Sequence, residues 1–538
     1  MFKRIFVYIF IFFIATALMQ CARRGRPTGG PKDIAPPVLL KSEPDNMSTD
    51  FKATRIRLYF DELVKLEDIQ EQLIVSPPLK YPPIITPQGG ANRFVEITLK
   101  DTLKENTTYT LNFGQSIVDN NEGNPNSFLT YVFSTGSYID SLEIKGAIKD
   151  AFNRKADEFV SVMLYEIDTS YTDSTIYKKP PNYITNTLDS AVIFTLRNIK
   201  AGKYALFALK DENKNHMFDQ NLDKIGFIED TVSIPTDSTF LLTLFKETLD
   251  YKTSVPSLVA SNRIVFGYYG DGKDIEISPL TVLPDSIKTT VTKEHEKDTL
   301  NFWFTPFEMD SLIFTIENKA LKAIDTFTVK KRKVGFDTLQ LKPNISGSLD
   351  FNTPFSIQAN TPLVAIDTSK MGFMDKDSLS VGFTATLDSL NSKVDFDFER
   401  KPEENYELQL MPGAITDFFG IQNDSMYIRL ATKSYADFGN LSMNIKAKPG
   451  DCPMIIQLTS EKGEVIQELY AEEPKRVEFK HIKPANYLVR IVLDLNKNGK
   501  WDPGNYLEKL QPEKVVYYPD AIEVRANWEL EQSFTILD

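Results

Sequence analysis

Two segments of this chain carry carboxylate and amide oxygens at alternating positions. The first segment has Asp211, Asn213, Asn215 and Asp219, and the second has Asp494, Asn496, Asn498 and Asp502. Oxygen ligands spaced in this way are what a hard cation such as Ca²⁺ requires. In the second segment Gly499 allows a sharp turn, and the carbonyl of Lys500 adds a further oxygen. The spacing therefore predicts two weak, structural calcium sites and no cofactor that the protein requires.

The match to a calcium-binding EF-hand loop is incomplete in both segments. The twelfth position holds Asn505 in the second segment and Leu222 in the first, where an EF-hand has a bidentate Glu. His216 also replaces the turn glycine in the first segment, so Asp223 or Glu508 would have to complete the shells. With so few carboxylates, the expected Kd is roughly 10⁻⁴–10⁻³ M. The alternative is a turn in which Asp and Asn side chains bond their own backbone.

The two acidic segments belong to a duplicated module. Each follows a β-like lead-in, 198–204 before the first and 481–487 before the second, and one constant offset aligns the lead-ins and the acidic residues. We expect Phe218 and Trp501, which end the acidic runs, to plug the core beneath each turn. Internal repetition of this kind predicts two copies of one structural unit.

Other chemistry is scarcely represented. The three histidines, His216, His295 and His481, have no metal-ligand partner at a useful spacing, and no nucleophile, phosphate-loop or dinucleotide motif occurs. Cys452 fits a buried apolar position better than a nucleophile. The sequence therefore favours a protein that is not an enzyme. A hydrolase built on two carboxylates stays open, because 74 acidic residues always supply pairs.

The N-terminus has the pattern of a targeting segment. Lys3 and Arg4 precede a short apolar run over 5–17, and Leu18-Met-Gln-Cys21 resembles the lipobox of bacterial lipoproteins. We expect a signal peptide over 1–20, a lipid on Cys21, and a Gly/Pro-rich linker over 21–36. The alternative is an ordinary signal peptide with an incidental cysteine. By resemblance to bacterial surface lipoproteins, which tend to carry acidic residues just after the cysteine, Arg23 and Arg24 favour the periplasmic face of the outer membrane over the cell surface.

Composition bounds the architecture. A chain of 538 residues with 42% apolar and 12% aromatic residues is too long for one domain and can bury several cores. The formal net charge of −13 argues against a nucleic-acid partner. Short β-like runs, separated by Pro, Asn, Asp and Gly about every ten residues, predict an all-β chain of tandem β-sandwiches.

Motifs in residues 37–137 resemble the bacterial Ig-like domain of the S-layer (SbsA) type. They are Ile56–Val64, Ile74–Pro78, Asn106–Leu111, Ile117–Asp119 and Tyr131–Gly136. Much of the pattern recurs around Leu363, Tyr406, Asp417 and Thr432, which predicts a second Ig-like domain over 346–435. The acidic-loop modules, 138–249 and 436–538, resemble transthyretin-like or collagen-binding-B-type sandwiches, and 250–345 reads as a further β-domain. As a whole, the chain resembles Ig-like-domain lipoproteins of the Bacteroidota.

Several Asp-Ser/Thr-apolar triplets, such as Asp140-Ser-Leu and Asp377-Ser-Leu, are similar to O-glycosylation sites of exported Bacteroidota proteins. The alternative is that these pairs simply precede strands. Taken together, these features predict a lipid-anchored envelope scaffold, an accessory component of an outer-membrane complex with a protein partner. A glycan- or peptide-binding surface and a carboxylate-based hydrolase are the alternatives.

Overall fold

The alternation of residues in the long strand β2 (Arg55–Leu66) shows how the first domain builds its core. Ile56, Leu58 and Phe60 are buried, while Arg57 and Tyr59 point to the opposite face. An extended chain places successive side chains on opposite faces of a sheet, so this period of two specifies one buried face. The computed structural model describes residues 33–127, 129–187, 192–295, 297–308, 310–448 and 450–536.

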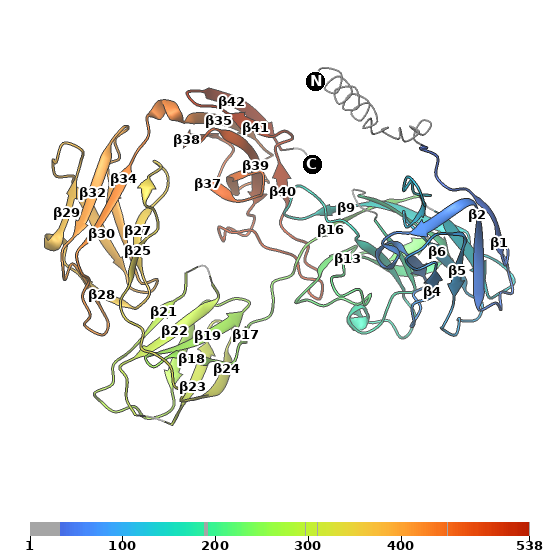
Figure 1. Cartoon of the computed structure of the whole chain (residues 1–538), viewed down its shortest axis with the longest axis horizontal. Coiled ribbons are helices and arrows are strands. Elements are labelled where there is room, and N and C mark those ends of the chain that lie inside the picture. Colours follow the sequence, from blue (N-terminus) through green and yellow to red (C-terminus); the bar gives the residue numbers. More distant parts are fainter. Residues whose placement is uncertain are drawn as a thin grey trace, which may run out of the picture. The chain divides into compact units, whose positions relative to one another are not determined.

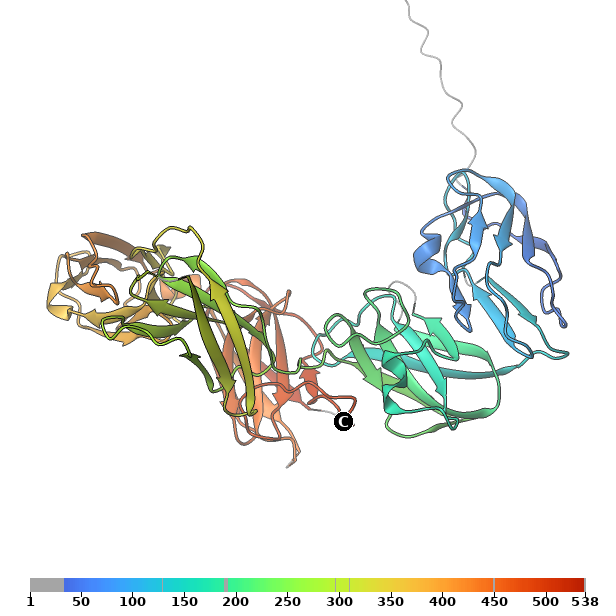
Figure 2. The same ribbon diagram turned by 90° about the horizontal axis from the view of Figure 1, so that it is seen from below.

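The chain divides into two compact units, and the first comprises residues up to 143 with 182–188 and 196–201. Its larger sheet has the order β1-β2-β5-β4, with β7 also paired to β2. The smaller sheet is β3-β6-β8. The short helix α2 (Ile69–Gln72) follows β2 (Figure 2). The remaining bounds are β1 Leu39–Glu43, β3 Ile74–Ser76, β4 Ile84–Thr86, β5 Asn92–Thr98, β6 Thr108–Asn112, β7 Ile117–Asp119, β8 Thr130–Ser134 and β11 Tyr183–Asn186.

The second unit begins with the first acidic-loop module. Its central strand β13 (Gly202–Lys210) pairs with β10 (Ser161–Glu166) on one side, and with β14 (Lys224–Phe227) and β15 (Val232–Ile234) on the other. A second layer contains β9 (Leu142–Asp150) and β16 (Thr239–Leu244), which run parallel. The strand β12 spans Ile193–Ile199, and a 3₁₀ helix spans Asp173–Tyr177.

The second acidic-loop module, whose strands β35 and β37 to β42 are labelled in Figure 1, repeats this arrangement. The match is strand for strand, because β11 pairs with β10 in the first module as β37 pairs with β36 in the second. Its central strand β39 (Ala485–Leu493) pairs with β36 (Met454–Ser460), β40 (Val515–Tyr517) and β41 (Ile522–Val524). The strands β35 (Gly439–Lys446) and β42 (Glu529–Thr535) run parallel, as β9 and β16 do. The other strands are β37 Val465–Ala471 and β38 Arg476–Ile482, and a 3₁₀ helix spans Tyr435–Asp437. The duplication predicted from the sequence is thus present in the fold.

Two further β-domains lie between the modules in the sequence. The first has sheets β17-β19-β22-β21 and β20-β23-β24, with β18 also paired to β19. Their bounds are β17 Lys252–Thr253, β18 Ser257–Ala260, β19 Arg263–Tyr269, β20 Ile275–Pro279, β21 Thr289–Lys293, β22 Thr299–Phe304, β23 Ser311–Asn318 and β24 Ala323–Lys330. Phe266, Phe302 and Phe314 lie at the centre of its core.

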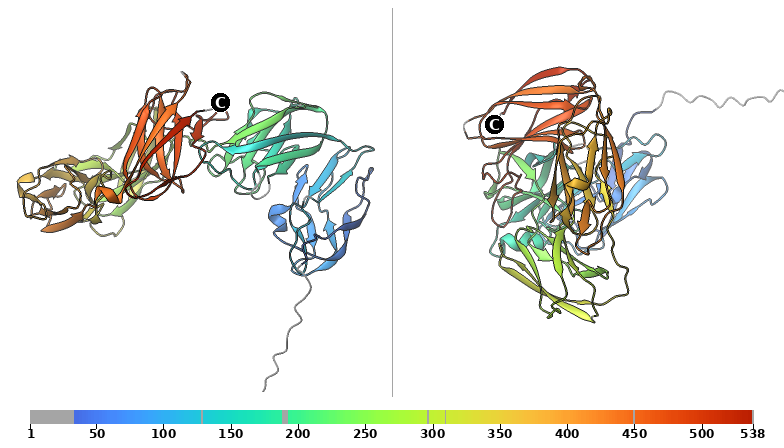
Figure 3. Two further views of the ribbon diagram at one scale, coloured as in Figure 1. Left: turned by 90° about the horizontal axis from the view of Figure 1, so that it is seen from above. Right: turned by 90° about the vertical axis from the view of Figure 1, so that its left-hand side faces the viewer.

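The second intervening domain has sheets β25-β27-β31-β30 and β26-β34-β32-β29, with the pair β28-β33 (Figure 3). The bounds are β25 Leu341–Pro343, β26 Gly347–Ser348, β27 Phe355–Ala359, β28 Leu363–Ile366, β29 Met371–Met374, β30 Phe383–Asp388, β31 Lys393–Phe398, β32 Asn405–Leu410, β33 Ile415–Asp417 and β34 Met426–Ala431, with a 3₁₀ helix at Thr368–Lys370. The chain is all-β, as the sequence predicted. Among the described residues no helix has both the length and the apolar character of a membrane span.

A tyrosine corner, typical of Ig-like sandwiches, occurs in two domains. The hydroxyl of Tyr109 accepts a hydrogen bond from the backbone N–H of Lys104 at 2.8 Å. The hydroxyl of Tyr406 accepts the same bond from Lys401 at 2.7 Å. Such a corner ties the start of a strand to the backbone a few residues upstream. The domain that contains Tyr406, predicted as the second Ig-like domain, therefore shares this local hydrogen-bonding pattern with the first.

Candidate functional site

The second acidic loop is organised by Asp494, which is fully buried. Its carboxylate accepts hydrogen bonds from the backbone N–H groups of Asn498 (3.0 Å) and Gly499 (2.9 Å). The Asn496 side-chain oxygen accepts from Asn498 N at 3.1 Å, and the Asn498 side-chain oxygen accepts from Lys500 N at 3.0 Å. The side-chain amides of both asparagines donate to Asp502. The five predicted residues therefore meet in one loop.

The first acidic loop has the same geometry. The Asp211 carboxylate accepts from the N–H groups of Asn215 (3.3 Å) and His216 (2.7 Å). The side-chain oxygen of Asn213 accepts from Asn215 N at 3.2 Å, and that of Asn215 from Met217 N at 2.7 Å. His216 takes a φ of +58° where Gly499 has +75°, so the loop keeps its shape without the turn glycine. A side chain in this left-handed region costs about 1 kcal/mol relative to glycine.

Each loop is closed by one further carboxylate. Asp223 is fully buried and accepts from the N–H groups of Glu212 (2.9 Å) and Asp219 (2.8 Å), so it contacts the first loop. In the second loop the closing carboxylate is Glu513, which accepts from Asp502 N at 3.1 Å. The backbone N–H of Glu508 donates to the side-chain oxygen of Asn505 at 3.0 Å, and a role for Glu508 in a calcium shell stays a prediction. Glu513 lies beyond the loop in sequence, two residues before β40, where no local pattern marks it.

Burial sets the electrostatics of the loops. Desolvation raises the pKa of Asp223 and of Glu513, although backbone hydrogen bonds oppose the rise. Desolvation also lowers the pKa of His216, with Asp211 acting in the opposite direction. Within the described ranges, no group of three or more His, Cys, Asp or Glu side chains converges as metal ligands. The side-chain oxygens of Asp211 and Asp494 accept backbone N–H groups of their own loops, as in Asx turns. Calcium binding by these loops stays a prediction.

The aromatic residues that end the acidic runs differ. Phe218 is buried and its ring centroid lies 5.2 Å from that of Tyr177, so it plugs its own module as expected. Trp501 is only half-buried, and its ring lies 4.7 Å from Phe152 of the first module. Its indole N–H donates to the carbonyl of Glu513 at 3.0 Å. Trp501 therefore contributes to contact between the modules, which corrects the expectation of a core plug.

A turn of the second module inserts into the first. Tyr506 is 1% exposed, and its ring centroid lies 5.1 Å from that of Phe207 and 5.3 Å from that of Phe227. Its backbone N–H donates to the carboxylate of Glu247 at 2.6 Å. Lys509 next to the tip pairs with Asp173 at 2.7 Å. We call the turn Asn505–Leu510 the plug; it joins the two copies of the duplicated module.

A buried arginine strengthens the same interface. Arg490 on β39 is 3% exposed, and its guanidinium lies 4.1 Å from the ring centroid of Phe152. It donates to Gln457 at 2.5 Å, and Tyr517 beside it donates its hydroxyl proton to the Phe152 carbonyl at 2.8 Å. A desolvated cation over an aromatic ring contributes about 2 kcal/mol. The second module therefore contacts the first in two ways. Arg490 packs on the ring of Phe152, and the ring of Tyr506 packs against Phe207.

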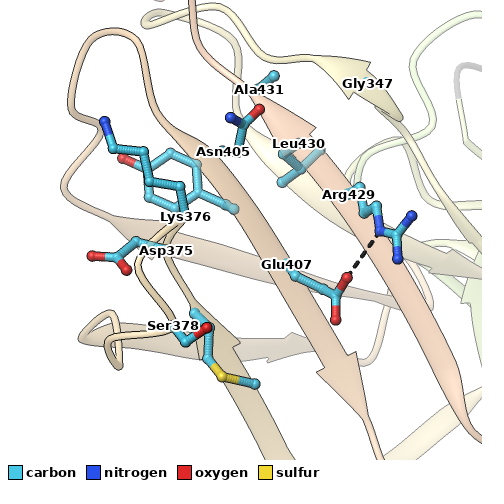
Figure 4. A pocket seen from close by; sticks show the side chains of 11 residues that line it. Gly347, Asp375, Lys376, Ser378, Asn405, Glu407, Arg429, Leu430 and Ala431 are labelled. Carbon is cyan, nitrogen blue, oxygen red and sulfur yellow. Dashed lines mark hydrogen bonds and ion pairs between the residues drawn. The ribbon is translucent and has the colours of Figure 1, made fainter.

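A pocket of about 420 Å³ with polar and apolar lining residues lies in the domain predicted as the second Ig-like domain (Figure 4). It opens on the sheet β26-β34-β32-β29. Its charged lining residues are Asp375, Lys376, Glu407 and Arg429, and the last two form an ion pair at 2.9 Å. Asn405 and the backbone around Gly347 complete one side. No pattern in the sequence marks this pocket, because its residues come from four separate segments.

Residues with other chemistry take structural positions. Cys452 is half-buried against the core of the second module, and burial raises the pKa of its thiol. His481 stacks on Tyr435, with ring centroids 4.7 Å apart, and desolvation lowers its pKa. A buried thiol with a raised pKa is a poor nucleophile. Cys21, Arg23, Arg24 and Arg26 lie outside the described residues.

These features define an all-β protein with an Ig-like first domain and a duplicated β-sandwich module. The family model of the bacterial Ig-like domain matches residues 33–135. The model of a family described as an uncharacterized protein conserved in bacteria (DUF2141) matches residues 152–244, which lie in the first acidic-loop module. No curated protein matches the chain. The transthyretin-like and collagen-binding-B resemblance of that module stays a prediction.

Several solved structures have a weak likeness to the chain. Domains 1–6 of the surface layer protein SbsC share 12% identity, with 91% of this chain and 67% of that chain covered and a TM-score of 0.14. The Bacillus anthracis TIE protein shares 10% identity over 95% of this chain and 76% of its own, with a TM-score of 0.13. The I9–I11 tandem of titin shares 8% identity over 52% of this chain and all (100%) of its own, with a TM-score of 0.12.

Proposed function

We propose that this protein is a non-enzymatic structural or interaction scaffold of the bacterial cell envelope. The observation that carries the proposal is that the buried and loop carboxylates of the two modules have structural hydrogen-bond partners. The carboxylates of Asp211 and Asp494 bond backbone N–H groups within their own loops, and Glu247 receives the N–H of Tyr506. These carboxylates hold turns and join β-domains, which is what a scaffold requires of them.

The Ig-like first domain supports the same function. Ig-like sandwiches present surfaces on a rigid frame, and their fold alone assigns no reaction. The outer-membrane position, the lipid on Cys21 and a protein partner in an envelope complex are parts of the proposal that rest on the sequence. The basic residues Arg23, Arg24 and Arg26 next to Cys21 favour the periplasmic face.

Palmitate labelling in the native bacterium tests the anchor. We expect label in the wild type and in Cys452→Ser, and none in Cys21→Ser. Cys452→Ser is the matched control because Cys452 is the other cysteine of the chain. Equal labelling of Cys21→Ser and wild type would refute the anchor. Protease digestion of intact and of permeabilised cells then decides the membrane face.

Crosslinked affinity purification from membranes tests the scaffold. We expect one envelope protein to copurify in a fixed ratio, and to be retained when the exposed Tyr427 is changed to Ala. Recovery of the chain alone at every crosslinker concentration would contradict a scaffold within a complex. Turnover of a saccharide or peptide substrate by the purified chain would favour the hydrolase instead.

A further inference from the structure

The polar pocket of the second Ig-like domain lies on the face of a sheet rather than at its edge. Its floor consists of β32 and β34, which pair with each other, and each has another strand on its far side. The backbone groups of β32 are therefore used in the sheet on both sides, whereas β26 covers β34 only at Leu430 and Ala431. A ligand that lies over this face, rather than along a strand edge, is recognised through the side chains that stand on it.

The side chains over this floor form a ladder of hydrogen-bonding groups. In register across β32 and β34, Glu407 faces Arg429 and Gln409 faces Tyr427. The Glu407 carboxylate accepts from Arg429 Nε at 2.9 Å, and the Gln409 amide donates to the Tyr427 hydroxyl at 2.9 Å. The side chain of Arg429 is 85% exposed, and Tyr427 is 57% exposed. Because Arg429 donates to Glu407 through Nε, the terminal N–H groups of its guanidinium can donate to a ligand. The side-chain oxygens of Glu407 and Gln409 can accept hydrogen bonds from it.

The charges of the pocket balance. Asp375 and Glu407 are acidic, and Lys376 and Arg429 are basic. Glu407 is paired with Arg429, Lys376 with the adjacent buried Glu404 at 3.8 Å, and the Asp375 carboxylate accepts the N–H groups of Asp377 (3.0 Å) and Leu379 (2.9 Å). Charges that are already paired give little electrostatic advantage to an anionic or a cationic ligand. The pocket suits a neutral ligand that both donates and accepts hydrogen bonds.

An exposed ring extends this polar surface. Tyr427 lies one rung along the ladder from Arg429, and Gly372 on β29, opposite Gln409, leaves that part of the face without a side chain. An aromatic ring offers an apolar face next to a polar tip. A sugar ring has the complementary pattern, because its C–H face is apolar and its edge carries hydroxyls. We propose that the face formed by Asn405, Glu407, Gln409, Tyr427 and Arg429 binds a neutral oligosaccharide.

Calorimetric titration of the purified full-length chain tests this proposal. The chain is kept in a detergent without a sugar headgroup and titrated with maltohexaose, cellohexaose and chitohexaose, and with hexagalacturonate as the charged comparison. We expect at least one neutral hexasaccharide to bind and hexagalacturonate to bind no more tightly. Glu407→Gln, which removes the pairing charge, and Tyr427→Ala, which removes the ring, should each weaken binding about tenfold or more.

The matched control is Glu96→Gln. Arg57 and Glu96 form the same type of cross-strand pair, at 2.7 Å, on the first Ig-like domain, next to Tyr59. This variant should bind as the wild type does. Absence of binding by all three neutral hexasaccharides, tighter binding of hexagalacturonate, or equal weakening by Glu96→Gln would overturn the proposal. The proposal would also be overturned if an extended polyglycine-serine peptide bound to the wild-type chain and this binding were lost in Glu407→Gln.

The proposed saccharide site goes beyond the scaffold function, and the two proposals can be refuted independently. Tyr427→Ala should weaken saccharide binding about tenfold or more while Cys21 labelling and partner recovery stay at the wild-type level. Far-ultraviolet circular dichroism of each variant, matching the wild type, assigns any loss to the pocket. Tyr427 and Arg429 are exposed, so their substitution leaves the core of the domain intact.

Discussion

The ring of Tyr506 stands edge-on to the ring of Phe207, with the centroids 5.1 Å apart and the planes at 84°. Tyr506 belongs to the second copy of the duplicated module, whereas Phe207 is on the central strand of the first. The residues between the copies form two complete β-domains. The plug thus joins segments far apart in sequence, and loop closure over such a length costs only a few kcal/mol.

Removal of the plug ring should destabilise the paired modules. We expect Tyr506→Ala to lower the free energy of unfolding of this part by about 3–5 kcal/mol, because the side chain is fully buried and leaves a cavity. Tyr506→Phe keeps the ring and should cost about 1 kcal/mol. Urea unfolding followed by tryptophan fluorescence, with Trp501 next to the interface, measures both. A Tyr506→Ala loss no larger than that of the exposed Tyr427→Ala would show that the plug contributes nothing.

The buried carboxyl of Glu247 should make stability fall as pH rises. Desolvation raises the pKa of Glu247 from 4.5, so the native state holds the proton more tightly than the unfolded state does. Its contribution is complete below about pH 4.5 and is lost as pH rises through the raised value. Glu247→Gln stays neutral and can still accept the Tyr506 N–H. We expect a flatter stability profile above pH 4.5 and at least wild-type stability at pH 7.

Chemical denaturation at closely spaced pH values between 4 and 8 gives the two profiles. The exposed Glu403→Gln, from another domain, serves as the charge control and should keep the wild-type slope. Parallel profiles for wild type and Glu247→Gln would mean that the carboxyl titrates alike in both states.

Calcium, if it binds the acidic loops, should raise their melting temperature slightly. At millimolar calcium and a Kd of about 10⁻⁴ M, binding contributes about 1.4 kcal/mol per site, which corresponds to about 5 °C for a module of this size. Scanning calorimetry of the full chain with calcium and with chelator measures the shift. Asp494→Ala/Asp502→Ala should reduce it, and the exposed turn variant Asp367→Ala should not. An unchanged wild-type trace in chelator would leave the loops as Asx turns.

The two tyrosine corners should contribute equally to their domains. Tyr406→Phe leaves the N–H of Lys401 without its 2.7 Å partner, and Tyr109→Phe does the same to Lys104. Each loss should cost about 1–2 kcal/mol of domain stability. Thermal unfolding resolves the effect, and Tyr427→Phe on the same domain as Tyr406 is the exposed control. A cost in one corner only would show that the second domain uses Tyr406 differently.

Features encoded over a few residues could be predicted from the sequence. The duplicated loops were predicted from their repeated Asp and Asn residues, and both adopt one geometry, even where His216 replaces glycine. Asx side chains bond N–H groups four and five residues ahead, so the pattern needs no distant partner. The closing carboxylate of Glu513 could not be predicted in this way, because it comes from beyond the plug and no local pattern links it to the loop.

The sequence by itself determined the all-β class, the internal repeat and the Ig-like first domain. All three depend on the period-two burial of strands such as β2 and on turn residues close in sequence. Only the tertiary structure decided that Tyr506 enters the first module, that Arg490 stacks on Phe152, and that Glu407 and Arg429 meet over a pocket. Apolar burial is non-directional, so a sequence indicates which side chains leave water but not which distant surface receives them.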